Sequence, residues 1–579
     1  MRKIMLVFKK VRIVILIFMM GLITFSISHA EAIIEGDRSV SVESKNGMVV
    51  TSHTLATEDA LEVLKNGGNA IDAAVTAAFS LAVTQPRSGN IGGGGFMLIS
   101  SESTNEVIAI DYREKAPSAA TGNMFLNADG NVDKNLSRYS HKAVGVPGTV
   151  AGLAFALEKY GTISLQKALL PAIKLAQEGF IVTPRFSNGI KASMKRLKSH
   201  DSTRKIFLKV DGKAYEPGER FVQRDLASTL KRISQNGVRE FYEGKTADLI
   251  IEEMQRGGGL ITRKDLHNYR PMIRKPVHGT YRGYDIYSMT TPSSGGIHIV
   301  QMLNILEEYP IGILGHNSAQ TIHFMAEAMR RAYADRSKFL GDADFVEVPL
   351  EGLASKKYAN QLRKSINPNK ASSSKSILPS NPIPYESNDT THFSIADRFG
   401  NVVSNTYTIN FSYGSHITVD GAGFLLNNEM DDFSSKPGVP NAYGLIGGKA
   451  NGIEPNKRML SSMSPTIVKK NMKNYLVTGS PGGSRIITTT LQVIMNVIDH
   501  RLNVQAAVSA PRIHHQWFPD EIRIEQGLSP DTIKILRDMG HTVNQKRAMG
   551  AIQSILIGDD GTFYGGADPR RSTSSARGF

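Results

Sequence analysis

Apolar and polar residues follow several distinct patterns along this chain, and each pattern predicts a type of element. Over residues 57–83 apolar positions recur at helical spacing around a Gly-Gly break, which predicts two packed helices, the first of them capped by Thr57. The glycine run 92–95 then leads into predicted strands over 97–100 and 107–112. Glycines in this position indicate backbone that packs too closely for any Cβ atom.

Helical and strand patterns are combined in the rest of the chain. We expect residues 148–340 to be mainly helical, whereas residues 392–396 and 402–409 alternate like two strands joined by a turn. Another helix is predicted over 485–498. Blocks of both kinds favour a layered α+β fold over a repeat architecture.

The pattern disappears between residues 366 and 389, where Ser, Pro and Asn become frequent, and this predicts a mobile connector. Thr390 follows it directly, at the start of a predicted strand. By itself a threonine there more often reflects β propensity, and its free hydroxyl is a weak nucleophile. Cleavage between Asp389 and Thr390 would add an α-amino group with a pKa of about 7.7–8.0, which can act as the base for that hydroxyl.

Composition limits the possible functions. The first thirty residues contain five basic residues, an apolar run and small residues ending at Ala30, which predicts a cleaved secretory signal over 1–30 and a periplasmic or secreted protein. A membrane anchor is the alternative, but the apolar stretch is shorter than the roughly 20 residues that a spanning helix needs. The net charge of +15 is scattered, which argues against nucleic-acid binding.

Several kinds of chemistry have no support in the sequence. The absence of cysteine excludes disulfides and thiol nucleophiles. No GxSxG, HExxH or Walker motif is found, and the pair His514-His515 lacks other ligands nearby, so we expect neither a metal ion nor an organic cofactor.

A set of motifs in a fixed order resembles the γ-glutamyltransferase family of the Ntn-hydrolase superfamily. They are GGNAIDAA (67–74), GNIGGGGFM (89–97), DYREKAP (111–117), DTTHFS (389–394), NTYTIN (405–410), LLNNEMDDFS (425–434), PNKRMLSSMSPT (455–466) and VTGSPGGSRIITT (477–489). The resemblance implies an α+β fold, a four-layer αββα sandwich built from two autocleaved subunits. These would be a large subunit, 31–389, and a small subunit, 390–579, that stay together.

The resemblance also implies roles for individual residues. Thr390 matches the nucleophile and Thr408 its supporting hydroxyl, while Gly482 and Gly483 match the backbone donors of the oxyanion hole. The substrate-binding residues are Arg113, Ser461 and Ser462 for the α-carboxylate of a γ-glutamyl group, and Asn410, Glu429 and Asp432 for its ammonium group. A lid over 437–448 would carry Tyr443 as its gate.

The implied reaction transfers γ-glutamyl groups, such as that of glutathione, through an ester on Thr390 to water or to amino acids and peptides, without a cofactor. One alternative is a relative with the same nucleophile but another acyl substrate, such as a cephalosporin acylase or a polyglutamate capsule transferase. Asp432 and the lid argue against the acylase. A non-enzymatic binding protein for amino acids is the other alternative, and it would have no use for Thr390 behind a connector.

Overall fold

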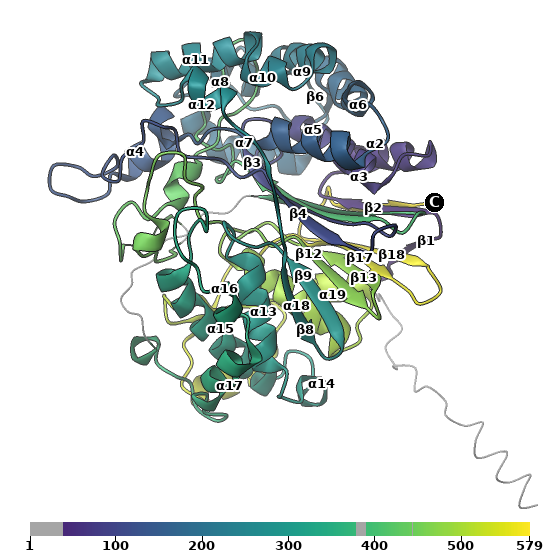
Figure 1. The fold of residues 1–579 in the computed structure, drawn as a ribbon, viewed down its shortest axis with the longest axis vertical. Helices are drawn as coiled ribbons and strands as arrows, with labels where there is room; N and C mark the ends of the chain where they lie inside the picture. Colours follow the sequence, from purple (N-terminus) through teal and green to yellow (C-terminus); the bar gives the residue numbers. More distant parts are fainter. Residues whose placement is uncertain (1–38, 378–389, 440, 443) are drawn as a thin grey trace, which may run out of the picture. The chain divides into compact units, whose positions relative to one another are not determined.

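Two seven-stranded antiparallel sheets lie at the centre of the protein, with helices on the outer face of each (Figure 1). The computed structural model describes residues 39–377, 390–439, 441–442 and 444–579. Within them, Ser41–Phe579 forms one compact unit.

The first sheet has the order β19-β2-β10-β11-β3-β4-β7. Its strands are β19 (Ser575–Gly578), β2 (Gly47–Thr51), β10 (Thr391–Asp397), β11 (Val402–Thr408), β3 (Gly94–Ser100), β4 (Val107–Asp111) and β7 (Met272–Arg274). The second sheet consists of β1 (Val42–Ser44), β18 (Phe563–Ala567), β17 (Gln553–Ile557), β13 (Lys473–Thr478), β12 (Thr466–Lys470), β9 (Tyr284–Ser288) and β8 (Val277–Tyr281), in that order. In both sheets, strands from before and after Thr390 are neighbours.

Side chains alternate between two cores along the strands of the first sheet. In β2, Met48 and Val50 lie in the core between the two sheets, whereas Val49 points to the core beneath the helices. The same alternation continues in β3. Strands with both faces buried therefore form the two inner layers of a sandwich.

Helices complete the two outer layers. The first sheet is covered by α2 (Thr54–Lys65), α3 (Ala70–Thr84), α5 (Thr149–Tyr160), α6 (Leu165–Glu178), α7 (Pro184–Leu197), α8 (Asp201–Phe207), α9 (Arg224–Asn236), α10 (Arg239–Tyr242), α11 (Lys245–Gly257) and α12 (Arg263–His267). The second is covered by α13 (Gly295–Leu306), α14 (Ile311–Leu314), α15 (Ala319–Phe339), α16 (Leu350–Leu353), α17 (Lys356–Lys364), α18 (Arg485–Ile498), α19 (Val504–Ser509) and α20 (Pro530–Asp538). The predicted αββα order is confirmed.

Smaller elements lie outside the two large sheets. They are α4 (Lys134–Tyr139), the pair β5 (Phe180–Ile181) and β6 (Arg220–Phe221), and the three-stranded sheet of β14 (Ile513–His514), β15 (Ile522–Ile524) and β16 (Val543–Gln545).

Several local predictions are confirmed. The two strands predicted after the connector are β10 and β11, which pair with each other, and the helix predicted over 485–498 is α18. The glycine run is as tightly packed as expected, because a Cβ atom on Gly93 would lie 2.0 Å from the carbonyl oxygen of Thr408. This close approach joins the start of β3 to the end of β11.

One local prediction is wrong and another is incomplete. The first helix, α2, begins at Thr54 after His53, whose imidazole accepts the N–H of Leu55, and Thr57 is buried inside the helix instead of capping it. The region 148–340 is mainly helical, as predicted, but it also contains the short strands β5 to β9. Strands β8 and β9 form a hairpin at one edge of the second sheet.

The part of the predicted connector that the structure describes, residues 366–377, is held in place. Ser374 is fully buried, its N–H donates to Asp520 (2.7 Å), and its carbonyl oxygen accepts the indole N–H of Trp517 (3.0 Å). Most of these residues are nevertheless exposed or half-exposed, as predicted, and within 366–377 only Ile366 and Ser374 are buried. The remainder, 378–389, lies outside the described residues.

An ion-pair network contacts this segment. It consists of Glu327, Arg330 and Arg331 of α15 together with Asp520, and we call it the α15 cluster. The carboxylate of Glu327 pairs with Arg331 (2.6 Å) and Arg330 (3.3 Å), and it accepts the N–H of Ser372 (3.1 Å). Arg330 also pairs with Asp520. The two cations and two anions are matched within one network.

Candidate active site

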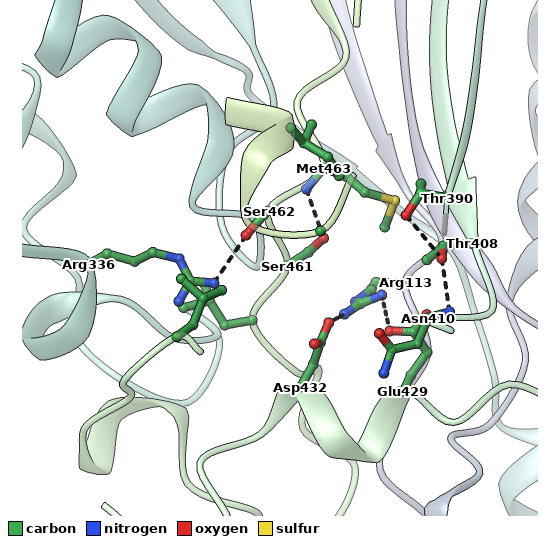
Figure 2. A pocket seen from close by; sticks show the side chains of 14 residues that line it. Arg113, Arg336, Thr390, Thr408, Asn410, Glu429, Asp432, Ser461, Ser462 and Met463 are labelled. Atoms are coloured by element: carbon green, nitrogen blue, oxygen red, sulfur yellow. Dashed lines mark hydrogen bonds and ion pairs between the residues drawn. The ribbon is translucent and has the colours of Figure 1, made fainter. Parts of the chain in front are cut away.

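A pocket lies where the first residues of β10 and the end of β11 meet the loop 458–463 and the short helix Glu429–Asp432 (Figure 2). Nine of the residues predicted for the site line it: Arg113, Thr390, Thr408, Asn410, Glu429, Asp432, Ser461, Ser462 and Gly483. Tyr443 and Asp389 lie outside the described residues. The structure thus brings together most of a set that is widely spread in the sequence.

Thr390 stands at the entrance of β10 and is 3% exposed. Its hydroxyl donates to the hydroxyl of Thr408 over 3.4 Å, a long hydrogen bond, and Thr408 also accepts the N–H of Asn410 (2.8 Å). Arg571 holds the carbonyl oxygen of Thr390 at 3.0 Å. The pairing of β10 with β11 fixes the distance between the two threonines, because they stand at the same end of adjacent strands.

Gly482 and Gly483 form the turn between β13 and α18. Their φ angles are +137° and +57°, values that L-residues with side chains rarely adopt. Gly483 lines the pocket, and Gly482 is its neighbour in the chain. This turn places backbone at the N-terminus of α18 beside Thr390, where N–H groups favour negative charge.

One arginine and three carboxylates form the most strongly charged part of the pocket, which we call the pocket cluster: Arg113, Glu114, Glu429 and Asp432. Arg113 is completely buried and pairs with Glu429 (2.6 Å) and Asp432 (2.6 Å), and more distantly with Glu114 (3.4 Å). If all groups were ionised, the cluster would carry an excess of negative charge. An arriving cation would reduce that excess.

Burial changes the acid strength of the pocket cluster. It raises the pKa of Glu114 to about 7, although the Arg113 guanidinium acts in the opposite direction. Burial also raises the pKa values of Glu429 and Asp432, again partly offset by Arg113. These carboxyl groups therefore ionise less readily than exposed ones, and a cation that binds beside them would favour their charged forms.

The two serines of the pocket are fixed by backbone and side-chain donors. Ser461 Oγ accepts the N–H of Met463 (3.0 Å), and Ser462 Oγ accepts an N–H of Arg336 (3.3 Å). The carbonyl oxygen of Ser461 accepts both the N–H (2.9 Å) and the hydroxyl (2.7 Å) of Ser294. The loop that carries the serines is thereby tied to the N-terminus of α13.

Two charged residues of the site were not predicted from the sequence. Glu114 follows Arg113 inside the motif at 111–117, and its position beside a predicted carboxylate clamp was the available signal. Arg336 lies in the last turn of α15. Its spacing of four from Ala332 and seven from Met329, both buried, would have placed it on the buried face of that helix.

The cavity itself is small, with a volume of about 20 Å³. This is enough for one water molecule and not for an amino-acid side chain. Arg113, drawn between Glu429 and Asp432, fills the centre of the pocket in Figure 2. A charged ligand would have to replace these ion pairs with its own contacts to Arg113, Glu429 and Asp432.

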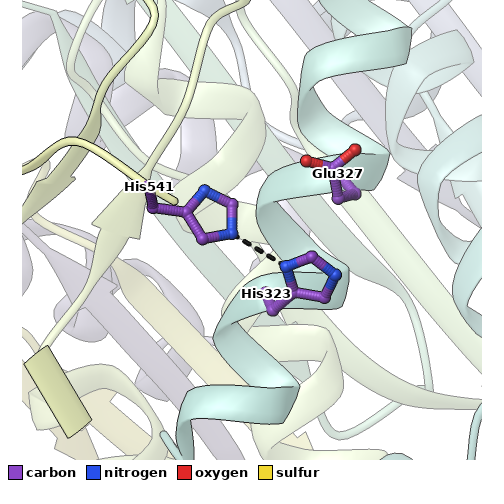
Figure 3. A group of neighbouring side chains, drawn as sticks. All are labelled: His323, Glu327 and His541. Atoms are coloured by element: carbon purple, nitrogen blue, oxygen red, sulfur yellow. Dashed lines mark hydrogen bonds between the residues drawn. The ribbon is translucent and has the colours of Figure 1, made fainter. Parts of the chain in front are cut away.

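A second group of potential ligand atoms lies beside α15, where His323 and Glu327 of that helix and His541, which precedes β16, bring their ligand atoms within 4.8 Å of one another (Figure 3). His323 Nε2 faces the carbonyl oxygen of Asn367 (2.8 Å), which can only accept, so Nδ1 is left to accept from Nε2 of His541 (2.8 Å). Because Glu327 is already paired with two arginines, a metal dication would enter next to two positive charges. The arrangement is explained as part of the ion-pair network.

The protein has a four-layer sandwich and a candidate hydroxyl nucleophile at the start of a central strand, which is the architecture of an Ntn-type hydrolase. Comparison with known sequences identifies the family. A family model described as "Gamma-glutamyltranspeptidase" matches residues 56–578. The chain therefore belongs to the γ-glutamyltranspeptidase family, whose members are enzymes of the Ntn-hydrolase type.

Individual relatives agree with this assignment. The chain is 52% identical over 547 residues to the glutathione hydrolase proenzyme of Escherichia coli (strain K12), and 94% of each chain is covered. Among solved structures, it is similar to a cephalosporin acylase from Bacillus halodurans, with a TM-score of 0.84, 29% identity and coverage of 95% of this chain and 98% of the other. A chain of Helicobacter pylori γ-glutamyltranspeptidase is 46% identical with a TM-score of 0.56, and 60% of this chain and 97% of that one are covered.

Proposed function

We propose that this protein is a self-processing γ-glutamyltransferase, which cleaves γ-glutamyl amides such as glutathione and transfers the group to water or to an amino acid or peptide. The observation that carries the proposal is the position of Thr390. It heads a central strand, its hydroxyl is 3.4 Å from that of Thr408, and the same pocket contains a buried arginine among carboxylates. A γ-glutamyl group carries a carboxylate and an ammonium, so it needs both kinds of partner.

Maturation would begin with attack of the Thr390 hydroxyl on the carbonyl carbon of the preceding peptide bond. The bond to the Thr390 nitrogen breaks as the ester forms, and water then hydrolyses the ester. The products are a new carboxyl end on residues 31–389 and a free α-amino group on Thr390. That amine has a reference pKa of about 7.7–8.0 and can accept the proton of the hydroxyl beside it.

In the proposed reaction, Thr390 Oγ attacks the γ-carbonyl carbon of the donor while its proton passes to the α-amine. The N–H groups of Gly482 and Gly483 would stabilise the oxyanion. The C–N bond then breaks, the amine takes the proton and leaves, and a γ-glutamyl ester remains on Thr390. Attack by water on this ester gives hydrolysis, and attack by an acceptor amine gives transpeptidation.

Substrate recognition would follow charge. Arg113, Ser461 and Ser462 would hold the α-carboxylate, because a guanidinium and hydroxyl groups can all donate hydrogen bonds to it. Asn410, Glu429 and Asp432 would hold the ammonium. The three carboxylates around Arg113 support this assignment, since the ammonium would offset the excess negative charge of the pocket cluster.

We also propose export of the protein to the periplasm or the medium, on the basis of the predicted signal over residues 1–30. In the part of the chain that the structure describes, no helix combines the length and the apolar character needed to cross a membrane.

The test is intact mass spectrometry of the wild type and Thr390→Ala, together with turnover of γ-glutamyl-p-nitroanilide on the same samples. We expect two chains from the wild type, the smaller starting at Thr390, and one uncut, inactive chain from the variant. Thr391→Ala, the same substitution one residue later, should still be cut. An uncut, inactive wild type would contradict the proposal.

A second donor separates this function from that of an acylase. Glutaryl-p-nitroanilide has the same acyl chain and carboxylate but lacks the ammonium group. A γ-glutamyltransferase should strongly prefer the γ-glutamyl donor, because Glu429 and Asp432 have no partner in the glutaryl compound. Equal or better turnover of the glutaryl donor would support the acylase instead.

A further inference from the structure

Arg336 is a buried cation of the pocket that forms no ion pair within 4 Å among the described residues, although Asp432 attracts it from farther away. It lies in the last turn of α15, is 5% exposed, and lines the same pocket as Ser461 and Ser462 (Figure 2). Its recorded hydrogen bonds go to the hydroxyl oxygens of Ser294 (2.9 Å) and Ser462 (3.3 Å). Buried arginines are normally paired with carboxylates, so this one calls for an explanation.

The chemistry of the guanidinium fixes the direction of these hydrogen bonds. Arginine has only donors, so Ser294 Oγ and Ser462 Oγ must both accept from Arg336. Ser294 uses its own hydroxyl proton on the carbonyl oxygen of Ser461. The hydroxyl proton of Ser462 has no acceptor among the residues that the structure describes.

Ser461 is oriented in the same way by a different donor. Its Oγ accepts the backbone N–H of Met463 (3.0 Å), so its proton is also left to donate. Both serines therefore take hydrogen bonds from the protein and can each offer one O–H to a ligand in the pocket. A pair of O–H donors matches the two oxygens of a carboxylate.

The balance of charge points to the same ligand. Arg113 already faces three carboxylates, and a ligand carboxylate would be a fourth. Arg336 is the additional positive charge, and although burial lowers its pKa to about 10, it remains protonated at neutral pH. Its charge lies on the side of the pocket where Ser462 is located.

We propose that Arg336 is a positioning residue that makes Ser462 a hydrogen-bond donor to the α-carboxylate of the γ-glutamyl donor. The inference rests on the proposed function and adds a residue that determines specificity for it. Donors that lack an α-carboxylate gain nothing from Arg336. The residue thus contributes to discrimination between α-amino acids and their decarboxylated analogues.

The test compares two donors on one preparation of the mature enzyme: γ-glutamyl-p-nitroanilide and 4-aminobutyryl-p-nitroanilide, which lacks only the α-carboxylate. For Arg336→Gln we expect the ratio of their kcat/KM values to fall about 30-fold, mostly through a higher KM for the γ-glutamyl donor. The ratio does not depend on how much of the variant folds. Lys338→Gln removes an exposed charge from the same helix and should leave the ratio within about 3-fold of the wild type.

Two further variants test the route through Ser462. Arg336→Lys keeps the charge and should recover part of the ratio. In Arg336→Gln/Ser462→Ala the loss should be close to that of the larger single variant, because the two residues act as one unit. If the loss in the double variant equals the product of the losses in the two single variants, Arg336 contacts the carboxylate independently of Ser462. That result would overturn the proposed route.

Other outcomes separate this inference from the proposed function. An equal loss for both donors in Arg336→Gln would assign Arg336 a purely structural role and overturn the inference, while leaving the function intact. A wild type that turns over neither donor would instead contradict the proposed function.

Discussion

The pocket cluster and the α15 cluster are both buried networks of arginines and carboxylates, but their charges are balanced differently. In the α15 cluster two arginines meet two carboxylates, and although burial opposes ionisation, Arg330, Ser372 and Arg331 lower the pKa of Glu327 to about 2. In the pocket cluster a single arginine meets three carboxylates, and burial raises the pKa of Glu114 to about 7. Removing one partner of a matched pair leaves a buried charge uncompensated, whereas charges already in excess are available to a ligand.

The largest effect should come from removing the cation of the pocket cluster. For Arg113→Gln we expect kcat/KM for γ-glutamyl-p-nitroanilide to fall about 10³-fold, because the α-carboxylate loses its main partner. The melting temperature should change little, since the three carboxyl groups can take up protons. A variant that unfolds instead of losing substrate would show that the pocket cluster, like the α15 cluster, serves stability.

An intermediate effect is expected in the α15 cluster. Glu327→Gln should lower the free energy of unfolding at pH 7 by about 3 kcal/mol, because two buried arginines lose a shared anion. The kcat/KM of the folded fraction should stay within about 3-fold of the wild type. Urea titration and initial rates measure the two quantities, and Glu351→Gln at an exposed site is the control.

The same variant has a defined pH dependence. The folded pKa of Glu327, about 2, lies below its ordinary value of 4.5, so its ionised form stabilises the folded state above pH 4.5. That contribution is lost as the pH falls from 4.5 towards 2. The stability difference between wild type and Glu327→Gln should therefore shrink over this window, and a constant difference would mean that the charge is not responsible.

An effect of the opposite sign is expected for Glu114→Gln. The folded pKa of Glu114, about 7, lies above 4.5, so the folded state binds more protons and loses stability as the pH rises between these values. Glutamine has no such penalty. We expect the variant to be more stable than the wild type at pH 8 by up to about 3 kcal/mol and by less than about 1 kcal/mol at pH 5, as measured by urea titration at both pH values.

Much of the fold could be predicted from local sequence. The β10–β11 pair and α18 have long, regular apolar patterns, and the glycine run marks a close approach. The hairpin of β8 and β9 was missed because each strand has only five residues and lies between helices. His53 was missed as a cap because histidine is not among the residues that usually begin helices.

The sequence selected residues that line one pocket, but it did not indicate how they are organised there. Motif resemblance selected Arg113 and Asp432, yet they lie 319 positions apart, and no local pattern indicates that they form an ion pair. The direction of the hydrogen bond at Ser462, a loop residue, depends on Arg336, which belongs to helix α15. Such properties arise from tertiary packing and can be seen only in the three-dimensional structure.

The interleaving of strands in the two sheets has a further consequence for the refolding of the mature enzyme after denaturation. In the first sheet β10 and β11 lie between β2 and β3, so strands that precede Thr390 flank strands that follow it. Cleavage before Thr390 would leave every ladder intact but would divide the chain that once linked them. Before the cut, folding is an intramolecular process; after it, a denatured molecule must find a second chain in solution. Recovery of mature enzyme from urea should therefore depend on protein concentration, whereas recovery of an uncleaved precursor should not.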